Sequence, residues 1–190
     1  NADTAAWVTT ETPNAGENIE RIAREWRFDA TNDVGSVTVS IDASNLPELN
    51  AGFTVYMLML DVDGDFTSGV TYYPLSNTTG SIYEASGVTI PDQSYMSLAV
   101  VKPVIQFATT SSQENEPNSP ATLTIELNYP LSNDVTIDYS ATGTATAGGV
   151  DYTFPAGTST ITAGNTSATL NITIINDTDV ESDETIVVTL

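Results

Sequence analysis

Acidic side chains without basic partners are the residues of this chain most able to do chemistry. Between residues 103 and 190 the sequence carries eleven Asp and Glu residues and no Lys, Arg or His. Two carboxylates about 5 Å apart repel each other by roughly 0.8 kcal/mol in water and by about 3 kcal/mol at an effective dielectric constant near 20. That repulsion is large against the net stability of a small domain. Because carboxylate oxygens are hard ligands, the sequence predicts a bound divalent cation, Ca²⁺ before Mg²⁺.

The first acidic segment is DVDGD, which directly follows an apolar run and offers Asp61, Asp63 and Asp65 as ligands. Its spacing matches the opening of an EF-hand loop, but Tyr72 stands where that loop needs a bidentate Glu, and no helices are expected beside it. An EF-hand is therefore excluded, and we expect a shorter calcium loop between strands. The simpler alternative is an Asp-Gly hairpin whose acids face water.

The second acidic segment, NDTDVESDE at 176–184, holds five carboxylates within eight positions. A solvated hairpin loop is the simpler interpretation here too, and a halophilic surface could also explain the acidity. Against the loop interpretation stands the absence of any nearby cation, which makes the repulsion needless for a loop that binds nothing.

Composition excludes several other kinds of function. Without Cys or His the chain has no disulfide, no thiolate or imidazole metal site, and no histidine base. A net charge of −21 repels nucleic acid. The longest apolar runs are too short to span a bilayer, so no direct membrane insertion is expected. A glycosidase using two of the carboxylates is conceivable, but no nucleophile is paired with a base, and we expect no enzyme activity.

Alternating apolar and polar residues recur between turn-forming clusters, which predicts an all-β chain of two tandem antiparallel β-sandwiches. The first domain is expected over 1–102 and the second over 103–190, joined by a very short linker. Strands are expected at 20–28, 36–41, 53–60, 70–74, 80–84, 87–90, 94–101, 121–128, 134–141, 157–162, 167–175 and 184–190, with a further strand opening at VIQFATT and entering Glu114–Glu116.

The segment RIAREWRF concentrates three of the four basic residues. As one strand it would place Ile22, Arg24, Trp26 and Phe28 on one face, so that Arg24 is semi-buried and needs a carboxylate, while Arg21 and Arg27 lie at the rim. Capture of an anionic ligand is the alternative to such structural pairing. The tyrosines at 72, 73 and 83 could stack on sugars, although aromatic residues on sandwich strands more often fill the core.

The second half contains the motifs GTATAGGVDY, AGNTSATL and IINDTDVESDETIVVTL. Together these resemble the Calx-beta domain over about 104–190. The resemblance implies a seven-stranded, immunoglobulin-like sandwich whose calcium ligands gather from separate loops at one end. It implies these ligands here: Glu116, Asp151, Asp177, Glu181 and Glu184. Asn176 and Thr178 stand where calcium-binding members carry acids, so one or two weaker sites are expected.

Residues 20–101 resemble an uncharacterised module that recurs in large secreted surface proteins and adhesins of marine and gliding bacteria. The chain begins at Asn1 without a signal segment and stops at Leu190 inside a predicted strand, so we expect it to be a piece of something longer.

These observations predict a calcium-stabilised, non-catalytic segment of a secreted bacterial cell-surface adhesin that acts as a rigid spacer or adhesion module. Its partners would be neighbouring domains of a longer chain, and its location extracellular. The alternative is a lectin-like tip module, in which calcium held by the DVDGD loop coordinates the hydroxyl groups of surface glycans.

Overall fold

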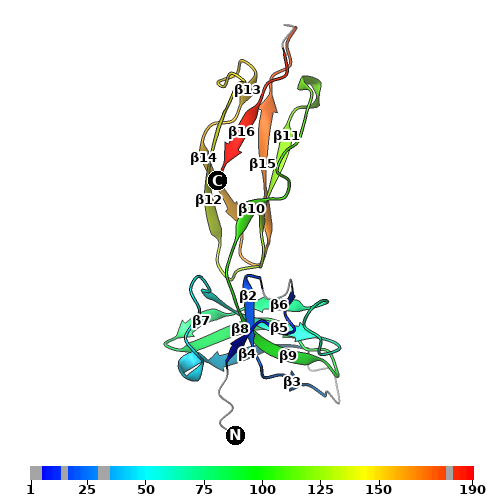
Figure 1. Cartoon of the computed structure of the whole chain (residues 1–190), viewed down its shortest axis with the longest axis vertical. Coiled ribbons are helices and arrows are strands. Elements are labelled where there is room, and N and C mark those ends of the chain that lie inside the picture. The colour runs from blue at the N-terminus through cyan, green and yellow to red at the C-terminus, as the bar shows by residue number, and fades with distance from the viewer. Residues whose placement is uncertain (1–5, 14–16, 30–34, 179–181) are drawn as a thin grey trace. The chain divides into compact units, whose positions relative to one another are not determined.

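The computed structural model describes residues 6–13, 17–29, 35–178 and 182–190. Contacts divide the chain into two compact units: Asn1–Val104 with Tyr129–Ser132, and Ile105–Asn128 with Asn133–Leu190. Both units consist of antiparallel β-ladders, which confirms the all-β prediction (Figure 1). No helix in the described parts of the chain is long and apolar enough to cross a membrane.

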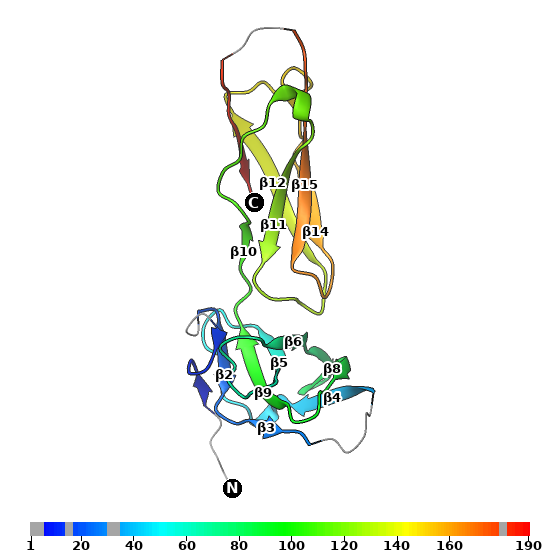
Figure 2. The same ribbon diagram turned by 90° about the vertical axis from the view of Figure 1, so that its right-hand side faces the viewer.

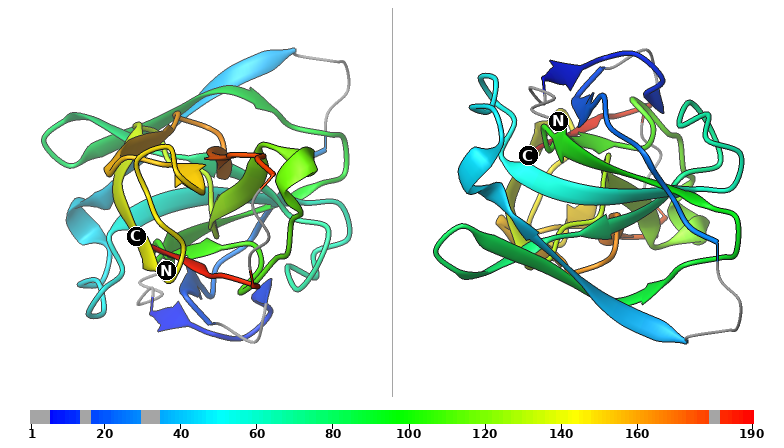
Figure 3. Two further views of the ribbon diagram at one scale, coloured as in Figure 1. Left: turned by 90° about the horizontal axis from the view of Figure 1, so that it is seen from above. Right: turned by 90° about the horizontal axis from the view of Figure 1, so that it is seen from below.

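The first unit contains two sheets. The larger has the order β1-β2-β9-β5-β6, with β3 also pairing with β9; the smaller has the order β4-β8-β7. Viewed along the vertical axis, β4 and β8 form a layer beside β5 and β9 (Figure 3). The elements are β1 (Trp7–Val8), β2 (Ile19–Ile22), β3 (Trp26–Arg27), β4 (Ser36–Asp42), the 3₁₀ helix η2 (Ala43–Asn45), β5 (Val55–Asp61), β6 (Thr71–Pro74), β7 (Ser76–Thr79), β8 (Ile82–Thr89) and β9 (Tyr95–Val101).

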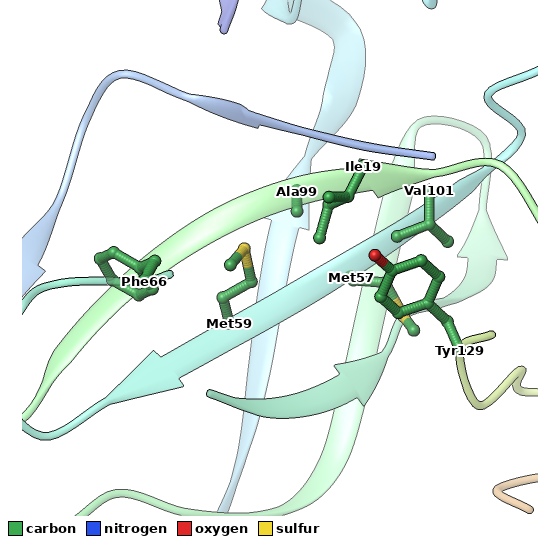
Figure 4. Close-up of a cluster of buried hydrophobic side chains, with 7 residues drawn as sticks. All are labelled: Ile19, Met57, Met59, Phe66, Ala99, Val101 and Tyr129. Carbon is green, nitrogen blue, oxygen red and sulfur yellow. The ribbon is translucent and has the colours of Figure 1, made fainter. Parts of the chain in front are cut away.

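Strand β5 is apolar on both faces because both faces are covered. Leu58 and Leu60 pack on one side in a cluster that includes Val88 of β8. Met57 and Met59 pack on the other side, where the cluster also contains Ile19, Phe66, Ala99, Val101 and Tyr129 (Figure 4). The tyrosines at 72, 73 and 83 pack half-buried against these two clusters. The prediction that they fill the core is therefore confirmed.

Two predicted strand boundaries in this unit are wrong. The expected strand 20–28 is interrupted after β2, where the Ser97 hydroxyl shares its one hydrogen between the carbonyl oxygens of Ile22 and Arg24. The expected strands 80–84 and 87–90 are instead the single strand β8. Gly87 continues the strand with a positive φ of 70°, in the stretch where the pairing with β4 shifts register.

The interruption after β2 also makes the prediction about Arg24 wrong. Arg21 is the buried cation, with 2% of its side chain exposed, while Arg24 is exposed. Because β2 ends at Ile22, the inward face is set by the alternation of Ile19 with Arg21 and does not continue to Arg24. Arg27 forms an exposed ion pair with Asp29.

The second unit is a sandwich of a four-stranded sheet, β10-β11-β15-β13, and a three-stranded sheet, β14-β12-β16 (Figure 2). The core between them includes Ile125, Ile161 and Leu170. Its elements are β10 (Ile105–Phe107), the 3₁₀ helix η3 (Glu116–Asn118), β11 (Ala121–Leu127), β12 (Val135–Gly143), β13 (Tyr152–Thr153), β14 (Gly157–Ile161), β15 (Ser167–Ile174) and β16 (Ile186–Thr189). Strand β10 ends at Phe107, so the predicted extension of a strand into Glu114–Glu116 is wrong.

Candidate metal centre

Four predicted ligands lie in connecting segments at one end of the second unit. Strand register sets this arrangement, because the start of β11 pairs with the end of β15, the start of β13 with the end of β15, and the end of β12 with the start of β16. The segments before β11, before β13, after β15 and before β16 therefore lie at the same end (Figures 1 and 2). They carry Glu116, Asp151, Asp177 and Glu184, respectively.

Asp151 is half-buried, and hydrogen bonds made by its backbone and by its carboxylate fix its position. Its N–H donates to the carbonyl oxygen of Thr146 at 3.0 Å, and its carboxylate Oδ2 accepts from the Thr146 N–H. Its carbonyl oxygen accepts from the N–H of Ile175 at 2.8 Å. These bonds hold the turn before β13 against the end of β15, so the position of the carboxylate is set before any ion binds.

Glu184 lies at the same end of the unit because the next residue, Thr185, is hydrogen-bonded to Thr144 and Ala145. The Thr185 carbonyl oxygen accepts from the N–H groups of Thr144 at 3.0 Å and Ala145 at 3.2 Å, and the Thr185 N–H donates to the Thr144 hydroxyl at 2.8 Å. Gly143 permits this approach. A Cβ atom at Gly143, whose φ is 145°, would lie 1.9 Å from the Thr185 carbonyl oxygen. The start of β16 is therefore clamped to the turn that leads to Asp151.

The clamp places two like-charged groups side by side. A side-chain hydrogen bond with Asp151 raises the pKa of Glu184, with further contributions from partial desolvation and from the Asp151 charge. Residues 103–190 contain no basic side chain to offset the pair. When both are ionised, two neighbouring carboxylates without a cation repel each other, an arrangement that a metal ion would stabilise.

Glu116 and Asp177 form the second contact at this end. Glu116 lies half-buried in η3, and its carboxylate Oε2 accepts from the backbone N–H of Asp177 at 3.4 Å. Asp177 lies two residues after Ile175, whose N–H donates to the Asp151 carbonyl oxygen. Glu116 and Asp151 therefore both contact the segment that leaves β15. Glu181, the fifth predicted ligand of this half, lies outside the described residues.

Within the described ranges, no three acidic side chains are close enough together to hold a metal ion. The structure instead brings Asp151 and Glu184 together as a pair, and places the Glu116 carboxylate against the backbone N–H of Asp177. All of them are hard oxygen donors, which fit Ca²⁺. Thr144 and Thr185, which position the pair, were not predicted, because they are separated by 41 positions and no local spacing indicates their contact.

The DVDGD segment of the first unit is arranged differently. The Asp61 side chain is buried, and its Oδ1 accepts from the N–H groups of Asp63 and Gly64, each at 2.8 Å. The Asp63 Oδ1 accepts from the Asp65 N–H at 2.9 Å, and the Asp65 Oδ1 accepts from the Thr67 N–H at 3.2 Å. The backbone bond from Asp65 lowers the pKa of Asp63, as does a side-chain hydrogen bond with Asp61. Backbone donors thus stabilise the charge on this loop.

The same loop is anchored to the core of the first unit by an aromatic residue. Phe66 follows DVDGD directly and is fully buried in the hydrophobic cluster with Met59 (Figure 4). The centre of its ring lies 5.3 Å from the guanidinium carbon of Arg21. A cation over an aromatic face is a favourable contact. The loop is therefore tied both to the apolar core and to the buried cation.

Two family models match the chain. Residues 101–190 match the Calx-beta domain, which confirms the resemblance seen in the second half. Residues 1–94 match a domain of unknown function (DUF8202), a match that assigns no activity. No curated protein matches the chain. Calx-beta domains are associated with calcium binding and are a non-catalytic type of β-sandwich.

Proposed function

We propose that the second unit binds calcium at the end where Asp151 and Glu184 meet, and that calcium stiffens this unit as a non-catalytic module of a secreted surface protein. The observation that carries the proposal is the hydrogen-bonded clamp of Thr144 and Thr185, which holds Glu184 beside Asp151 in a domain without a basic side chain. Folding thereby creates a repulsion that a cation would remove.

Calcium suits the donors at this end of the sandwich. It takes six to eight oxygen ligands in flexible geometry, from carboxylates, amides, carbonyls and water. Asp151 and Glu184 would provide the central charge, with Glu116, Asp177 and Glu181 as further carboxylate donors. Asn176 offers an amide oxygen and less charge, which favours weak binding. Extracellular modules bind calcium at about 0.1 to 1 mM.

The larger role follows from this chemistry and from the sequence. A module that becomes stiff at millimolar calcium suits an extracellular bacterial surface, and we propose an adhesin in which it serves as a spacer between neighbouring domains. The lectin-like alternative would need the DVDGD carboxylates to face a ligand. Asp63 and Asp65 are exposed, and the Oδ1 atoms of Asp61, Asp63 and Asp65 accept from backbone N–H groups of their own loop, which gives no specific support to an ion that binds sugar.

The test is calorimetric unfolding with calcium and with chelator. Calcium at a hundred times its dissociation constant adds about 2.7 kcal/mol by linkage, which raises the melting temperature of a unit of this size by about 10 to 20 °C. The two tryptophans, Trp7 and Trp26, both lie in the first unit. Tryptophan fluorescence therefore follows the first unit alone, and we expect its transition to move little.

Variants assign the effect to the site. The double variant Asp151→Asn and Glu184→Gln should lose most of the calcium-dependent shift. Its control is the double variant Asp138→Asn and Glu126→Gln, which removes the same charge from exposed positions on β12 and β11 and should keep the shift. Coincident calorimetric melts with and without calcium would overturn the proposal. A shift confined to tryptophan fluorescence would move the site to the first unit.

A further inference from the structure

The DVDGD loop contains a peptide bond that is chemically weak, the bond between Asp63 and Gly64. It is the only Asp-Gly step in the sequence, and the sequence has no Asn-Gly step. Glycine has no Cβ atom to hinder attack by its own amide nitrogen, and it adopts the backbone angles that such attack requires. The Asp63 side chain is exposed, so water reaches it. From the sequence alone, this step is expected to isomerise.

The isomerisation needs only water. The amide nitrogen of Gly64 attacks the side-chain carboxyl carbon of Asp63, a C–N bond forms, and the amide proton leaves with the carboxyl OH as water. A water molecule then opens the resulting succinimide ring. Opening at the side-chain carbonyl carbon restores aspartate. Opening at the main-chain carbonyl carbon leaves isoaspartate, in which the main chain runs through the former side chain and is longer by a methylene group.

In the folded loop, both reacting groups are held by other partners. The N–H of Gly64 donates to Oδ1 of Asp61 at 2.8 Å, so the proton that must leave is bound to a buried carboxylate. Oδ1 of Asp63 accepts from the N–H of Asp65 at 2.9 Å, which fixes the carboxyl group that would be attacked. The reaction must therefore pass through an open form of the loop, in which these hydrogen bonds are broken.

The backbone of Gly64 is also closely packed. Its φ is 84°, and a Cβ atom at this position would lie 3.3 Å from the ring of Tyr95. A methylene group added to the main chain beside Gly64 would disturb this contact or displace Phe66, which is fully buried two residues later. Isoaspartate at position 63 would therefore loosen the loop from the core of the first unit.

We propose that Asp63 is a site of isoaspartate formation that the folded loop suppresses, and that Asp61 is the residue that restrains it by holding the amide of Gly64. The role gives the buried carboxylate of Asp61 a function that needs no ligand. It goes beyond calcium binding by the second unit and does not depend on it.

The test is ageing of the whole chain at neutral pH. Isoaspartate is counted with a protein isoaspartyl methyltransferase and located by electron-transfer fragmentation. We expect the native chain to form isoaspartate at least about tenfold more slowly than the free peptide LDVDGDFTS, because the folded loop must first open.

Variants assign the restraint to Asp61. Asp61→Ala should raise the rate of isoaspartate formation by at least about fivefold, the equivalent of one lost hydrogen bond. Asp61→Asn keeps an acceptor oxygen and should stay close to the native rate. Glu48→Ala removes the same charge from an exposed position outside the loop and is the matched control.

A second readout needs no variant to fold. As urea is raised below the unfolding transition, hydrogen exchange at the Gly64 amide and isoaspartate formation should accelerate in parallel, because both require the loop to open. Equal rates in the native chain and the free peptide would overturn the proposal. An unchanged or slower rate in folded Asp61→Ala would also overturn it, and the slower rate would mean that Asp61 acts as a base that removes the amide proton.

Discussion

The two acidic regions carry similar charge and differ in which contacts dominate around their carboxylates. In the first unit, Asp61, Asp63 and Asp65 each accept hydrogen bonds from backbone N–H groups of their own loop. In the second unit, Glu184 is held against Asp151, another carboxylate. Both regions hold neighbouring carboxylates, but backbone donors lower the pKa of Asp63, whereas contact with Asp151 raises the pKa of Glu184. A run of acids in a sequence therefore does not by itself indicate a metal site.

What separates the two regions is where the neutralising groups come from. A short loop with glycine in it can turn its own N–H groups onto its carboxylates, and Gly64 adopts a φ of 84° to do so. Where strand ends from distant parts of the sequence meet, backbone N–H groups are already hydrogen-bonded to neighbouring segments, as the Ile175 N–H is to the Asp151 carbonyl oxygen. Asp151 still accepts from the Thr146 N–H there, whereas Glu184 lies against the Asp151 carboxylate, which raises its pKa.

The largest expected effect tests the cation of the first unit. Arg21→Ala removes the buried guanidinium, its ion pairs with Glu11 and Glu25, and its contact with Phe66. It also leaves the carbonyl oxygens of Thr10 and Ile22 without this donor. We expect the first unit to lose about 3 kcal/mol of unfolding free energy, measured by denaturant titration of tryptophan fluorescence.

The controls for this prediction are Arg24→Ala and Arg27→Ala, which remove the same charge from exposed positions and should cost less than about 0.5 kcal/mol. Equal losses for all three variants would mean that net charge, and not the buried network of Arg21, stabilises this unit.

An intermediate effect tests the clamp of the second unit. Gly143→Ala places a Cβ atom 1.9 Å from the Thr185 carbonyl oxygen, so the end of β12 and the start of β16 must separate. We expect a loss of about 2 kcal/mol in the calorimetric unfolding of this unit, together with a smaller calcium-dependent shift. Gly164→Ala is the control. Its φ is also positive at 80°, but no atom lies within 4 Å of the added Cβ, so it should cost about 1 kcal/mol and keep the calcium shift. A calcium shift that is unchanged by Gly143→Ala would separate the clamp from the site.

The sequence predicted those features that depend on local pattern. Alternation over SVTVSID predicted the half-buried face of β4, and the continuous apolar run predicted β5 as a central strand. The motifs of the second half predicted its sandwich fold. The sequence could not predict that Arg21 is buried, because this depends on where β2 ends. Nor could it predict that Asp61 is capped by N–H groups, or that Thr185 holds Glu184 beside Asp151, because loop conformation and strand register decide both contacts.

The smallest effect concerns pH and has opposite sign in the two units of the metal-free protein. Contact with Asp151 raises the pKa of Glu184 above 4.5, so its contribution to stability is fully present below pH 4.5 and is lost as the pH rises through the raised value. Backbone bonding lowers the pKa of Asp63 below 3.8, so its contribution is present above pH 3.8 and is lost as the pH falls through the lowered value.

Stability profiles of metal-stripped protein should therefore slope in opposite directions. Calorimetry should show the second unit losing stability as the pH rises above about 4.5, while tryptophan fluorescence shows the first unit losing stability as the pH falls below about 3.8. Glu184→Gln should flatten the first of these slopes and leave the second unchanged, because it removes only the titrating partner of Asp151. Parallel slopes in the two units would show that the pair at the end of the sandwich is not electrostatically strained, and the need for a cation there would disappear with it.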